Sequence, residues 1–267
     1  MRWIDLAGSI TRYEWRVGTG RPLVLVHEMG GTLNSWDRML GHLHAQRPIL
    51  RYDMRGAGIS EKLRDVPYIE ELADDLALLL DELDVREPVD LAGSAIGAAV
   101  ALMCASRHAA KVSSVVAMSP VTEVATARRL TLMDVADRME RDGLRSMVDA
   151  HLGMSYPAEH IDDPQVFQEF RARWIANDPA SFALYYRMLA ELDIRPSLKA
   201  VECPVLVIGA KLDALRPVQA SQGVAAKIPN AQFLALDTGH FMHVQSPAAV
   251  AEALEEFFSL QQRVKPI

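Results

Sequence analysis

The fold of this chain is decided by the stretch Asp90–Leu102, which reads DLAGSAIGAAVAL. An apolar run that starts near Pro88 predicts a buried strand, and the small residues after Gly97 predict a helix that begins at once. The glycines Gly93 and Gly97 favour a tight turn, in which the strand and the helix approach so closely that a Cβ atom would collide. This Gly-x-x-x-Gly layout is typical of a turn that lifts a nucleophilic side chain above a sheet.

The nucleophile position of this turn is occupied by Ala95, and a methyl group cannot attack a carbonyl. Ser94 cannot take over, because a turn centred on it would place the bulky Ile96 where a small residue belongs. We therefore interpret Ala95 as the replacement of a serine, made to trap an enzyme in an inactive form. The alternatives are a natural protein that uses its pocket without covalent chemistry, and an ordinary junction between a strand and a helix.

Length and composition favour a single soluble α/β domain. The chain has 267 residues, 50% of them hydrophobic, so it can bury one large core. Its 28 basic and 35 acidic residues give a net charge of −7, which argues against nucleic acid as a partner. No apolar run is long enough to cross a membrane, and the N-terminus lacks the apolar segment of a secretion signal. The two cysteines suit buried thiols in a reducing compartment, so we expect a cytoplasmic protein.

The other strands are expected to join the strand before Ala95 in a mostly parallel, eight-stranded sheet. Alternating residues predict a hairpin at one edge, whereas wholly apolar runs predict central strands that are covered on both faces. The expected strands are Trp3–Leu6, Ile10–Val17, Leu23–Val26, Ile49–Asp53, Val112–Met118, Pro204–Ile208 and Phe233–Leu236. The expected flanking helices are Ile69–Leu83, Ala98–Ala105 and Pro247–Phe258.

The alternation of strand and helix stops from Val121 to about Arg195, where the pattern becomes helical. A long helical insertion after the sixth strand predicts a cap over the site, which would exclude water. We therefore divide the chain into a core, residues 1–120 and 196–267, and a cap, residues 121–195. Periodicity alone does not decide which apolar cap residues face inward, and the candidates for substrate contact are Met147, Met154, Trp174 and Tyr185.

Two loops that follow the last strands supply an acid and a base, Asp213 and His240. The order nucleophile, acid, base along the chain is that of hydrolases in which the imidazole moves a proton and the carboxylate orients the imidazole. Glu123 is a rival for the acid, since some hydrolases place the carboxylate after an earlier strand. His243 is a poorer candidate for the base than His240, and we expect it to support the site or to lie at the surface.

The loop after the strand Leu23–Val26 reads His27-Glu28-Met29-Gly30-Gly31 and predicts half of an oxyanion hole. Its glycines let the backbone fold so that an amide points inward. The two donors would be the N–H groups of Met29 and Ile96. The other interpretation of this loop is a glycine turn that only leads to the next helix.

With these pieces the chain resembles the α/β-hydrolase superfamily from Arg21 to Phe258. Within the superfamily it is most similar to the 3-oxoadipate enol-lactonase branch. The superfamily likeness lies in residues 26–31 and 53–60, in the turn at Ala95, and in Asp213 and Gly239-His240; the likeness to the branch lies in residues 30–37, 177–182 and 193–195. The resemblance implies attack by a serine on an ester, lactone, amide or activated C–C bond of a small molecule, without a cofactor.

The sequence departs from this family pattern at Ala95 and at Glu28, which stands where a glycine is usual. A carboxylate beside an oxyanion hole disfavours an anionic substrate unless it points away or is neutralised, and we expect Glu28 to contact the substrate. Our first hypothesis is a serine hydrolase inactivated at position 95. The alternatives are a natural ligand-binding protein on this scaffold and an enzyme that uses His240 as a base without a covalent step. The sequence leaves the oligomeric state open, a homodimer included.

Overall fold

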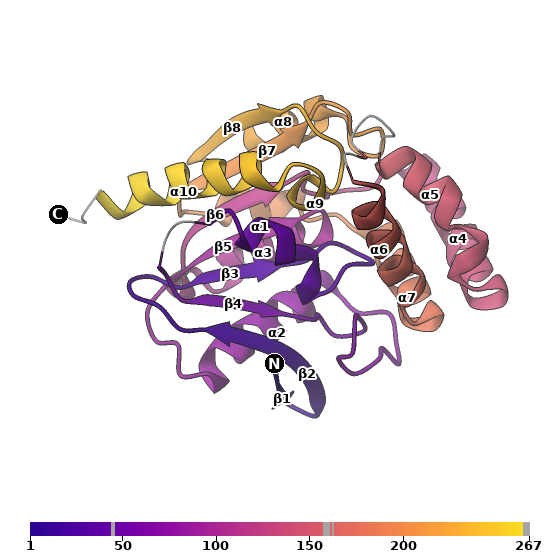
Figure 1. The fold of residues 1–267 in the computed structure, drawn as a ribbon, viewed down its shortest axis with the longest axis horizontal. Coiled ribbons are helices and arrows are strands. Elements are labelled where there is room, and N and C mark those ends of the chain that lie inside the picture. The colour runs from indigo at the N-terminus through magenta and orange to yellow at the C-terminus, as the bar shows by residue number, and fades with distance from the viewer. Residues whose placement is uncertain (44–45, 157–160, 162, 264–267) are drawn as a thin grey trace.

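The computed structural model describes residues 1–43, 46–156, 161 and 163–263, and an eight-stranded sheet runs through its centre (Figure 1). The spatial order of the strands is β1-β2-β4-β3-β5-β6-β7-β8, and β2 runs antiparallel to its two neighbours while the other neighbouring pairs are parallel. The strands are β1 (Arg2–Leu6), β2 (Ser9–Arg16), β3 (Leu23–Val26), β4 (Ile49–Tyr52), β5 (Val89–Ser94), β6 (Val112–Met118), β7 (Val205–Ala210) and β8 (Ala231–Leu236).

Helices cover both faces of the sheet, because successive side chains of a strand point to opposite faces. In β3, Val24 and Val26 join an apolar cluster with one set of helices, whereas Leu23 and Leu25 join a second cluster with another set. The first set is α2 (Ile69–Glu82), α3 (Ile96–Arg107) and α8 (Val218–Ala225). The second set is α1 (Asp37–Leu40), α9 (Met242–Gln245) and α10 (Pro247–Arg263). The predicted fold class, a mostly parallel sheet flanked by helices, is confirmed.

The tight turn predicted from the sequence lies between β5 and α3, and its backbone is strained. Ala95 has φ 51° and ψ −109°, a left-handed region that costs a residue with a Cβ atom about 1–3 kcal/mol. A Cβ atom on Gly93 would overlap the carbonyl of Gly97, and a Cβ atom on Gly97 would overlap the carbonyl of Val26. The helix begins at Ile96, two residues earlier than expected, so no residue separates it from Ala95.

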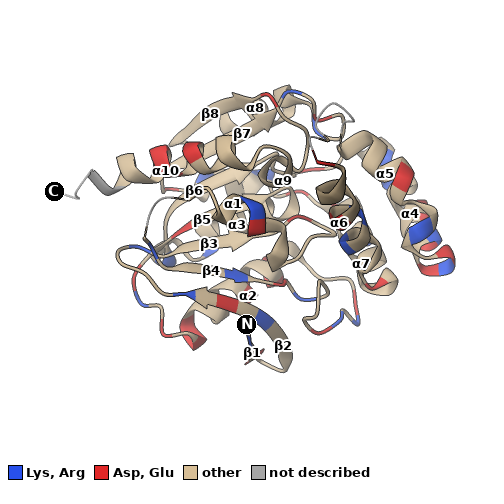
Figure 2. Cartoon of the chain, in the orientation of Figure 1, with Lys and Arg blue, Asp and Glu red and all other residues tan. Residues whose placement is uncertain are grey.

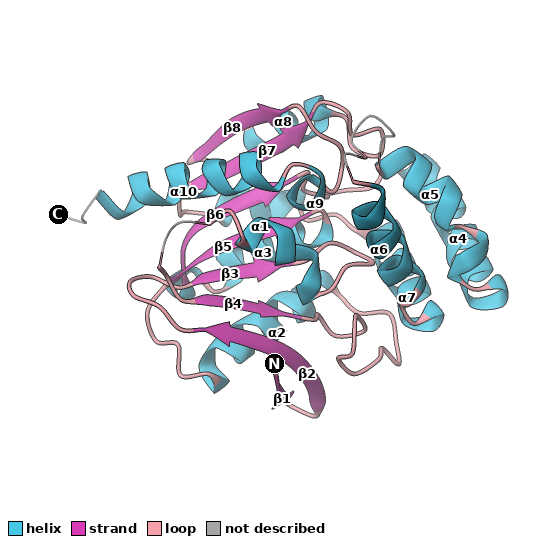
Figure 3. Ribbon diagram, in the orientation of Figure 1, coloured by secondary structure: helices cyan, strands magenta, loops and turns pink. Residues whose placement is uncertain are grey.

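In the part of the chain that the structure describes, four α-helices lie between β6 and β7, beyond the carboxyl ends of the parallel strands (Figure 3). We refer to α4 (Arg129–Asp142), α5 (Val148–Ser155), α6 (Pro164–Ile175) and α7 (Pro179–Glu191) as the cap helices. The two ends of this segment meet in an antiparallel bridge between Glu123 and Asp193, and the Ile194 N–H donates to the Thr122 carbonyl at 2.8 Å.

Charged residues are distributed as this layering requires. The central strands β3 and β6 contain none, whereas the cap helix α4 carries both signs on its outer surface (Figure 2). Within the described ranges, none of the helices combines the length and the apolar character that a membrane span would need.

The turn at Ala95 gives a prediction about stability. We expect Gly97→Ala to lower the free energy of unfolding by about 3 kcal/mol, because the added Cβ meets the Val26 backbone, which cannot move without shifting β3. Gly223→Ala is the matched control, since a Cβ atom on Gly223 in α8 meets nothing within 4 Å and should raise stability by up to about 1 kcal/mol. Urea unfolding followed by circular dichroism measures both; equal effects of the two substitutions would contradict the proposed overlap.

Candidate active site

Asp213 and His240 come together at the ends of two neighbouring strands. Asp213 lies three residues after β7 and His240 four residues after β8, and parallel neighbours bring these two loops to the same edge of the sheet. The His240 Nδ1 lies 2.6 Å from Asp213 Oδ2. The other oxygen of Asp213 accepts hydrogen bonds from the N–H groups of Leu215 and Arg216, at 2.9 and 2.8 Å. The imidazole is therefore fixed through Nδ1, and Nε2 is the nitrogen that Asp213 leaves unbound.

The carboxyl group of Asp213 is held in its ionised form. Burial by itself raises the pKa of Asp213. The hydrogen bond and charge of His240, together with the Arg216 N–H, lower the pKa by more than burial raises it, so that the net shift is downward. An ionised Asp213 fixes the tautomer of His240 with the proton on Nδ1. His240 can then accept a proton at Nε2.

Glu123, the rival acid, is engaged elsewhere. Its carboxylate lies 2.6 Å from Arg195 and 3.6 Å from Lys227, and its carbonyl accepts a hydrogen bond from the Arg216 side chain at 3.2 Å. The structure therefore pairs His240 with Asp213 rather than with Glu123.

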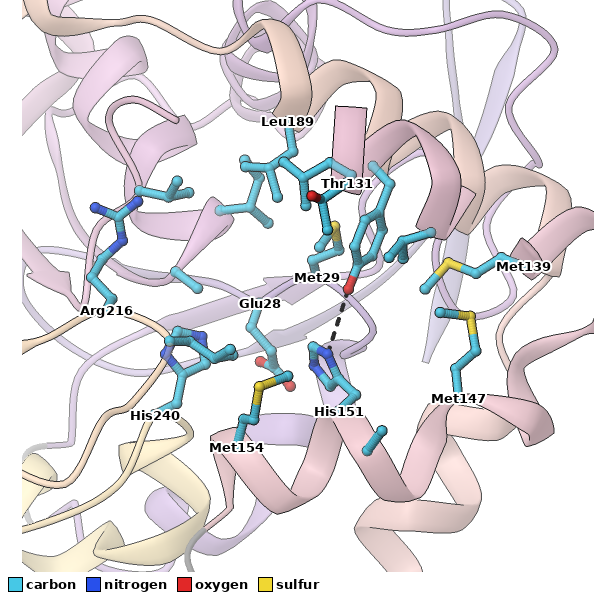
Figure 4. Close-up of a pocket in the computed structure, with 18 of the residues that line it drawn as sticks. Glu28, Met29, Thr131, Met139, Met147, His151, Met154, Leu189, Arg216 and His240 are labelled. Atoms are coloured by element: carbon cyan, nitrogen blue, oxygen red, sulfur yellow. Dashed lines mark hydrogen bonds between the residues drawn. The ribbon is translucent and has the colours of Figure 1, made fainter. Parts of the chain in front are cut away.

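A cavity of about 360 Å³ lies between this dyad and the cap helices (Figure 4). Ala95, Ile96, Met29 and His240 line it from the core. The cap contributes mostly apolar side chains, which include Leu132, Val135, Met139, Met147, Met154, Trp174 and Leu189. Three of the apolar cap residues proposed from the sequence, Met147, Met154 and Trp174, thus line the cavity.

The expectation that Tyr185 contacts the substrate is wrong, because this side chain does not line the large cavity. Its hydroxyl donates to the Arg55 carbonyl at 2.6 Å, in the loop after β4, and its ring packs near Gly56. The next residue, Tyr186, lines the cavity instead. One residue along a helix turns the side chain by about 100°, so adjacent tyrosines of α7 face different neighbours.

Glu28 also departs from the expectation, because its carboxylate already has partners in the protein. Glu28 lines the cavity but is only 1% exposed. Its Oε1 accepts a hydrogen bond from Ser35 Oγ at 2.9 Å, and its Oε2 lies 3.0 Å from His243 Nε2. Burial raises the pKa of Glu28, but the charge of His243 and its polar contact outweigh burial and lower the pKa to about 2. Both oxygens of the carboxylate thus have partners within the protein.

His243 is fully buried, which excludes the surface position that the sequence left open. Its ring lies 4.4 Å from the ring of Trp36, centroid to centroid, and its Nε2 faces Glu28. His243 thus supports the loop that carries Met29 and does not face the reacting groups.

The two candidate oxyanion donors both line the cavity. Ile96 is the first residue of α3, so its N–H has no acceptor within the helix. Met29 precedes Gly30, whose φ of +83° turns the loop. The loop is held from the cap, because the Asn177 side chain donates to the Gly30 carbonyl at 2.8 Å. A Cβ atom on Gly30 would also overlap the ring of Trp174.

Sequence reasoning missed the polar residues that line the cavity from the cap, which are Arg128, Thr131, Arg138, Ser146, His151 and Tyr186. His151 was a lone histidine in an apolar helix, and only its position between three cap helices distinguishes it. As for metals, the described residues contain no group of three or more His, Cys, Asp or Glu side chains arranged to hold an ion.

Comparison with known proteins agrees with this geometry. The sequence matches the family described as the alpha/beta hydrolase family over residues 23–253. This chain belongs to the alpha/beta hydrolase family. It is 30% identical over 230 residues to the RutD protein of Pantoea ananatis, named as a carbamate hydrolase, with 84% of this chain and 83% of that protein covered. It is 22% identical over 234 residues to 3-oxoadipate enol-lactonase 2 of Acinetobacter baylyi, with 87% and 86% covered.

Solved structures show the same fold. A thermophilic esterase from Thermogutta terrifontis superposes on this chain with a TM-score of 0.90, at 24% identity, covering 98% of this chain and 99% of that one. The enol-lactonase from Burkholderia xenovorans gives a TM-score of 0.89 at 23% identity, covering 97% and 100%. The superfamily resemblance and the fold predicted from the sequence are therefore confirmed, and an enol-lactonase is among the relatives.

The Glu28–His243 pair gives a prediction about acid stability. Because the pKa of Glu28 is lowered in the folded chain, its ionised form stabilises the fold at neutral pH, and this contribution is lost as the pH falls from about 4.5 to about 2. We expect Glu28→Gln to lower the free energy of unfolding at pH 7 by about 3 kcal/mol, with the gap to the unmodified chain closing in acid.

Urea unfolding at several pH values between 7 and 3 measures this gap. Glu202→Gln, a change at an exposed residue, is the control and should shift the unfolding free energy by less than about 0.5 kcal/mol. A Glu28→Gln variant as stable as the control at pH 7 would show that the pair does not stabilise the fold.

Proposed function

We propose that this protein is a serine hydrolase of a small ester, lactone or related carbonyl compound, in which Ala95 occupies the position of the nucleophile. The proposal rests on one observation: His240, whose Nδ1 lies 2.6 Å from Asp213 Oδ2, lines the same cavity as Ala95. The strained backbone of Ala95 is the one that presents a nucleophile in such a turn. A residue keeps a strained conformation only where the surrounding structure enforces it. The turn, the acid and the base therefore form one unit.

With serine at position 95, the reaction has the following steps. His240 Nε2 takes the hydroxyl proton while the oxygen attacks the substrate carbonyl, and the negative charge that develops is held by the N–H groups of Met29 and Ile96. The tetrahedral intermediate collapses when the protonated His240 gives its proton to the leaving oxygen. Water, activated by the same imidazole, then cleaves the acyl-enzyme and regenerates the serine. Asp213 stabilises the imidazolium in both halves.

The cavity limits what can enter. Its volume of about 360 Å³ suits a small molecule, and its apolar cap side favours a substrate with an uncharged hydrocarbon part. The names of two relatives, a carbamate hydrolase and an enol-lactonase, support cleavage of a carbonyl compound by this scaffold. We propose a small-molecule substrate of the ester or lactone class on these grounds.

Ala95 itself is proposed to replace a serine, as in a variant made to be inactive. Loss of such a nucleophile costs about 10⁶ in kcat, whereas the cavity and the dyad that bind and orient the substrate are retained. The chain as it stands would therefore hold its substrate without covalent attack.

The first test is Ala95→Ser. This substitution should raise kcat for the hydrolysis of short-chain p-nitrophenyl esters by a factor on the order of 10⁶ and should permit labelling by a fluorophosphonate. Peptide mapping should place the label on residue 95 and not on Ser94, which is fully buried. Ala95→Gly is the control and should stay unlabelled. A restored serine that reacts with neither the probe nor a panel of esters and lactones would refute the proposal and favour a natural ligand-binding protein.

The identity of the acid is tested in the Ala95→Ser background. Asp213→Asn should lower kcat by about 10⁴, because the imidazole loses the carboxylate that fixes its tautomer. Glu123→Gln should leave kcat within about twofold, since its carboxylate pairs with Arg195 and Lys227 rather than with His240. Ester hydrolysis followed spectrophotometrically measures both, and the reverse order of the two effects would assign the acid to Glu123.

A second candidate function is favoured by the intact dyad in a chain that lacks a nucleophile. His240, oriented by Asp213, can act as a general base on a water molecule or on an acidic substrate without a covalent step. This enzyme would turn over its substrate with Ala95 in place. His240→Ala would abolish that turnover, and Ala95→Ser would not increase it.

A further inference from the structure

Among the residues that the structure describes, one imidazole other than that of His240 lines the cavity, and it belongs to His151 of α5 (Figure 4). Two other cap helices fix its ring. The ring stacks on Trp174 of α6, with centroids 5.0 Å apart and planes at 28°, and its Nδ1 lies 3.5 Å from the hydroxyl of Tyr186 on α7. The rest of the cap lining is mostly apolar and includes Met139, Met147 and Met154, together with the charged side chains of Arg128 and Arg138.

His151 is uncharged at neutral pH. Burial lowers its pKa to about 4, and repulsion from His240 acts in the same direction. Burial raises the pKa of Tyr186, so the phenol keeps its proton and can donate it. When the Tyr186 hydroxyl is the donor in this contact, Nδ1 is the acceptor, and the neutral imidazole carries its own proton on Nε2. Among the described residues, His151 Nε2 has no hydrogen-bond partner, and the ring lines the cavity.

We propose that the Nε2–H of His151 is a substrate-binding donor that selects esters or lactones with a second, uncharged oxygen function, such as a keto or hydroxyl group. The proposal rests on the proposed function, because it concerns the same cavity. The oxyanion donors of the core hold the reacting carbonyl, and His151 holds the second oxygen from the cap. A neutral donor suits a neutral acceptor, because an anion held at His151 would meet no charge on that imidazole. In the described part of the chain, the positive charges that line the cavity are those of Arg128, Arg138 and Arg216, and they are the groups that an anionic substrate would contact instead.

The same geometry should disfavour a substrate whose acyl chain carries no second oxygen. A substrate without the second oxygen would cover the Nε2–H and leave it without an acceptor, and a buried donor left unpaired lowers affinity. Tyr186 and Trp174 contribute by position, since they hold the ring so that Nε2 rather than Nδ1 carries the proton. Tyr186 is thus a positioning residue and His151 a specificity residue.

The test uses binding to the unmodified chain, so that it does not depend on a restored serine. Ethyl 3-oxobutanoate and ethyl butanoate differ by one keto oxygen, and protein-observed NMR titrations give both dissociation constants. We expect His151→Leu to reduce the preference for the keto ester by about tenfold. Tyr186→Phe should reduce it by less. His42→Leu, which changes an exposed histidine outside the cavity, should leave the preference unchanged.

A second readout is independent of folding effects in the variants. Long-range ¹H–¹⁵N correlation spectra of the unmodified chain should show His151 as the Nε2–H tautomer at pH 7, and ethyl 3-oxobutanoate should shift its Nε2 resonance while ethyl butanoate should not. A Nδ1–H tautomer, or a keto-ester preference that His151→Leu leaves intact, would overturn the proposal. The proposal would also be overturned if monoethyl succinate bound more tightly than ethyl 3-oxobutanoate and His151→Leu left that affinity unchanged. The cavity would then select anions.

The outcomes separate this inference from the proposed hydrolase. If Ala95→Ser restores hydrolysis while His151→Leu leaves the ligand preference intact, the hydrolase stands and the role of His151 is refuted. If Ala95→Ser stays inactive while the preference depends on His151, the cavity binds oxygenated ligands without the serine mechanism.

Discussion

The contact between Gly97 and the carbonyl of Val26 is the constraint on which the rest of the site depends. β3 and β5 are parallel neighbours, with Val26 paired to Gly93, so the loops that leave them start side by side. Only a residue without a side chain lets the first turn of α3 pass under the end of β3. This close passage brings Ile96 to the loop that carries Met29, and it forces Ala95 into its strained conformation.

The fold and the dyad could be predicted because both follow from local patterns. A four-residue, wholly apolar run such as Leu23–Val26, in a chain where strands alternate with helices, predicts a central strand that is covered on both faces. Asp213 and His240 stand directly after such strands, and the ends of neighbouring parallel strands share one edge of the sheet. The pairing of two residues 27 positions apart thus follows from topology alone.

The cap and the partner of Glu28 could not be predicted in the same way. Which of Tyr185 and Tyr186 faces the cavity depends on the rotation of α7 about its axis, and packing against other helices sets that rotation. Glu28 and His243 lie on different loops, and neither residue type nor spacing indicates that they form an ion pair beneath the site. These features depend on how elements pack together, which a single sequence encodes only weakly.

The hydrogen bond from Asn177 to the Gly30 carbonyl has a consequence for ligand exchange. It joins the connection between α6 and α7 to the same loop that carries the Met29 amide. Displacement of this corner of the cap would therefore also move the amide that we propose as an oxyanion donor. Under the proposed function, product release through that corner would disturb the position of this donor, whereas release elsewhere in the cap would leave it in place.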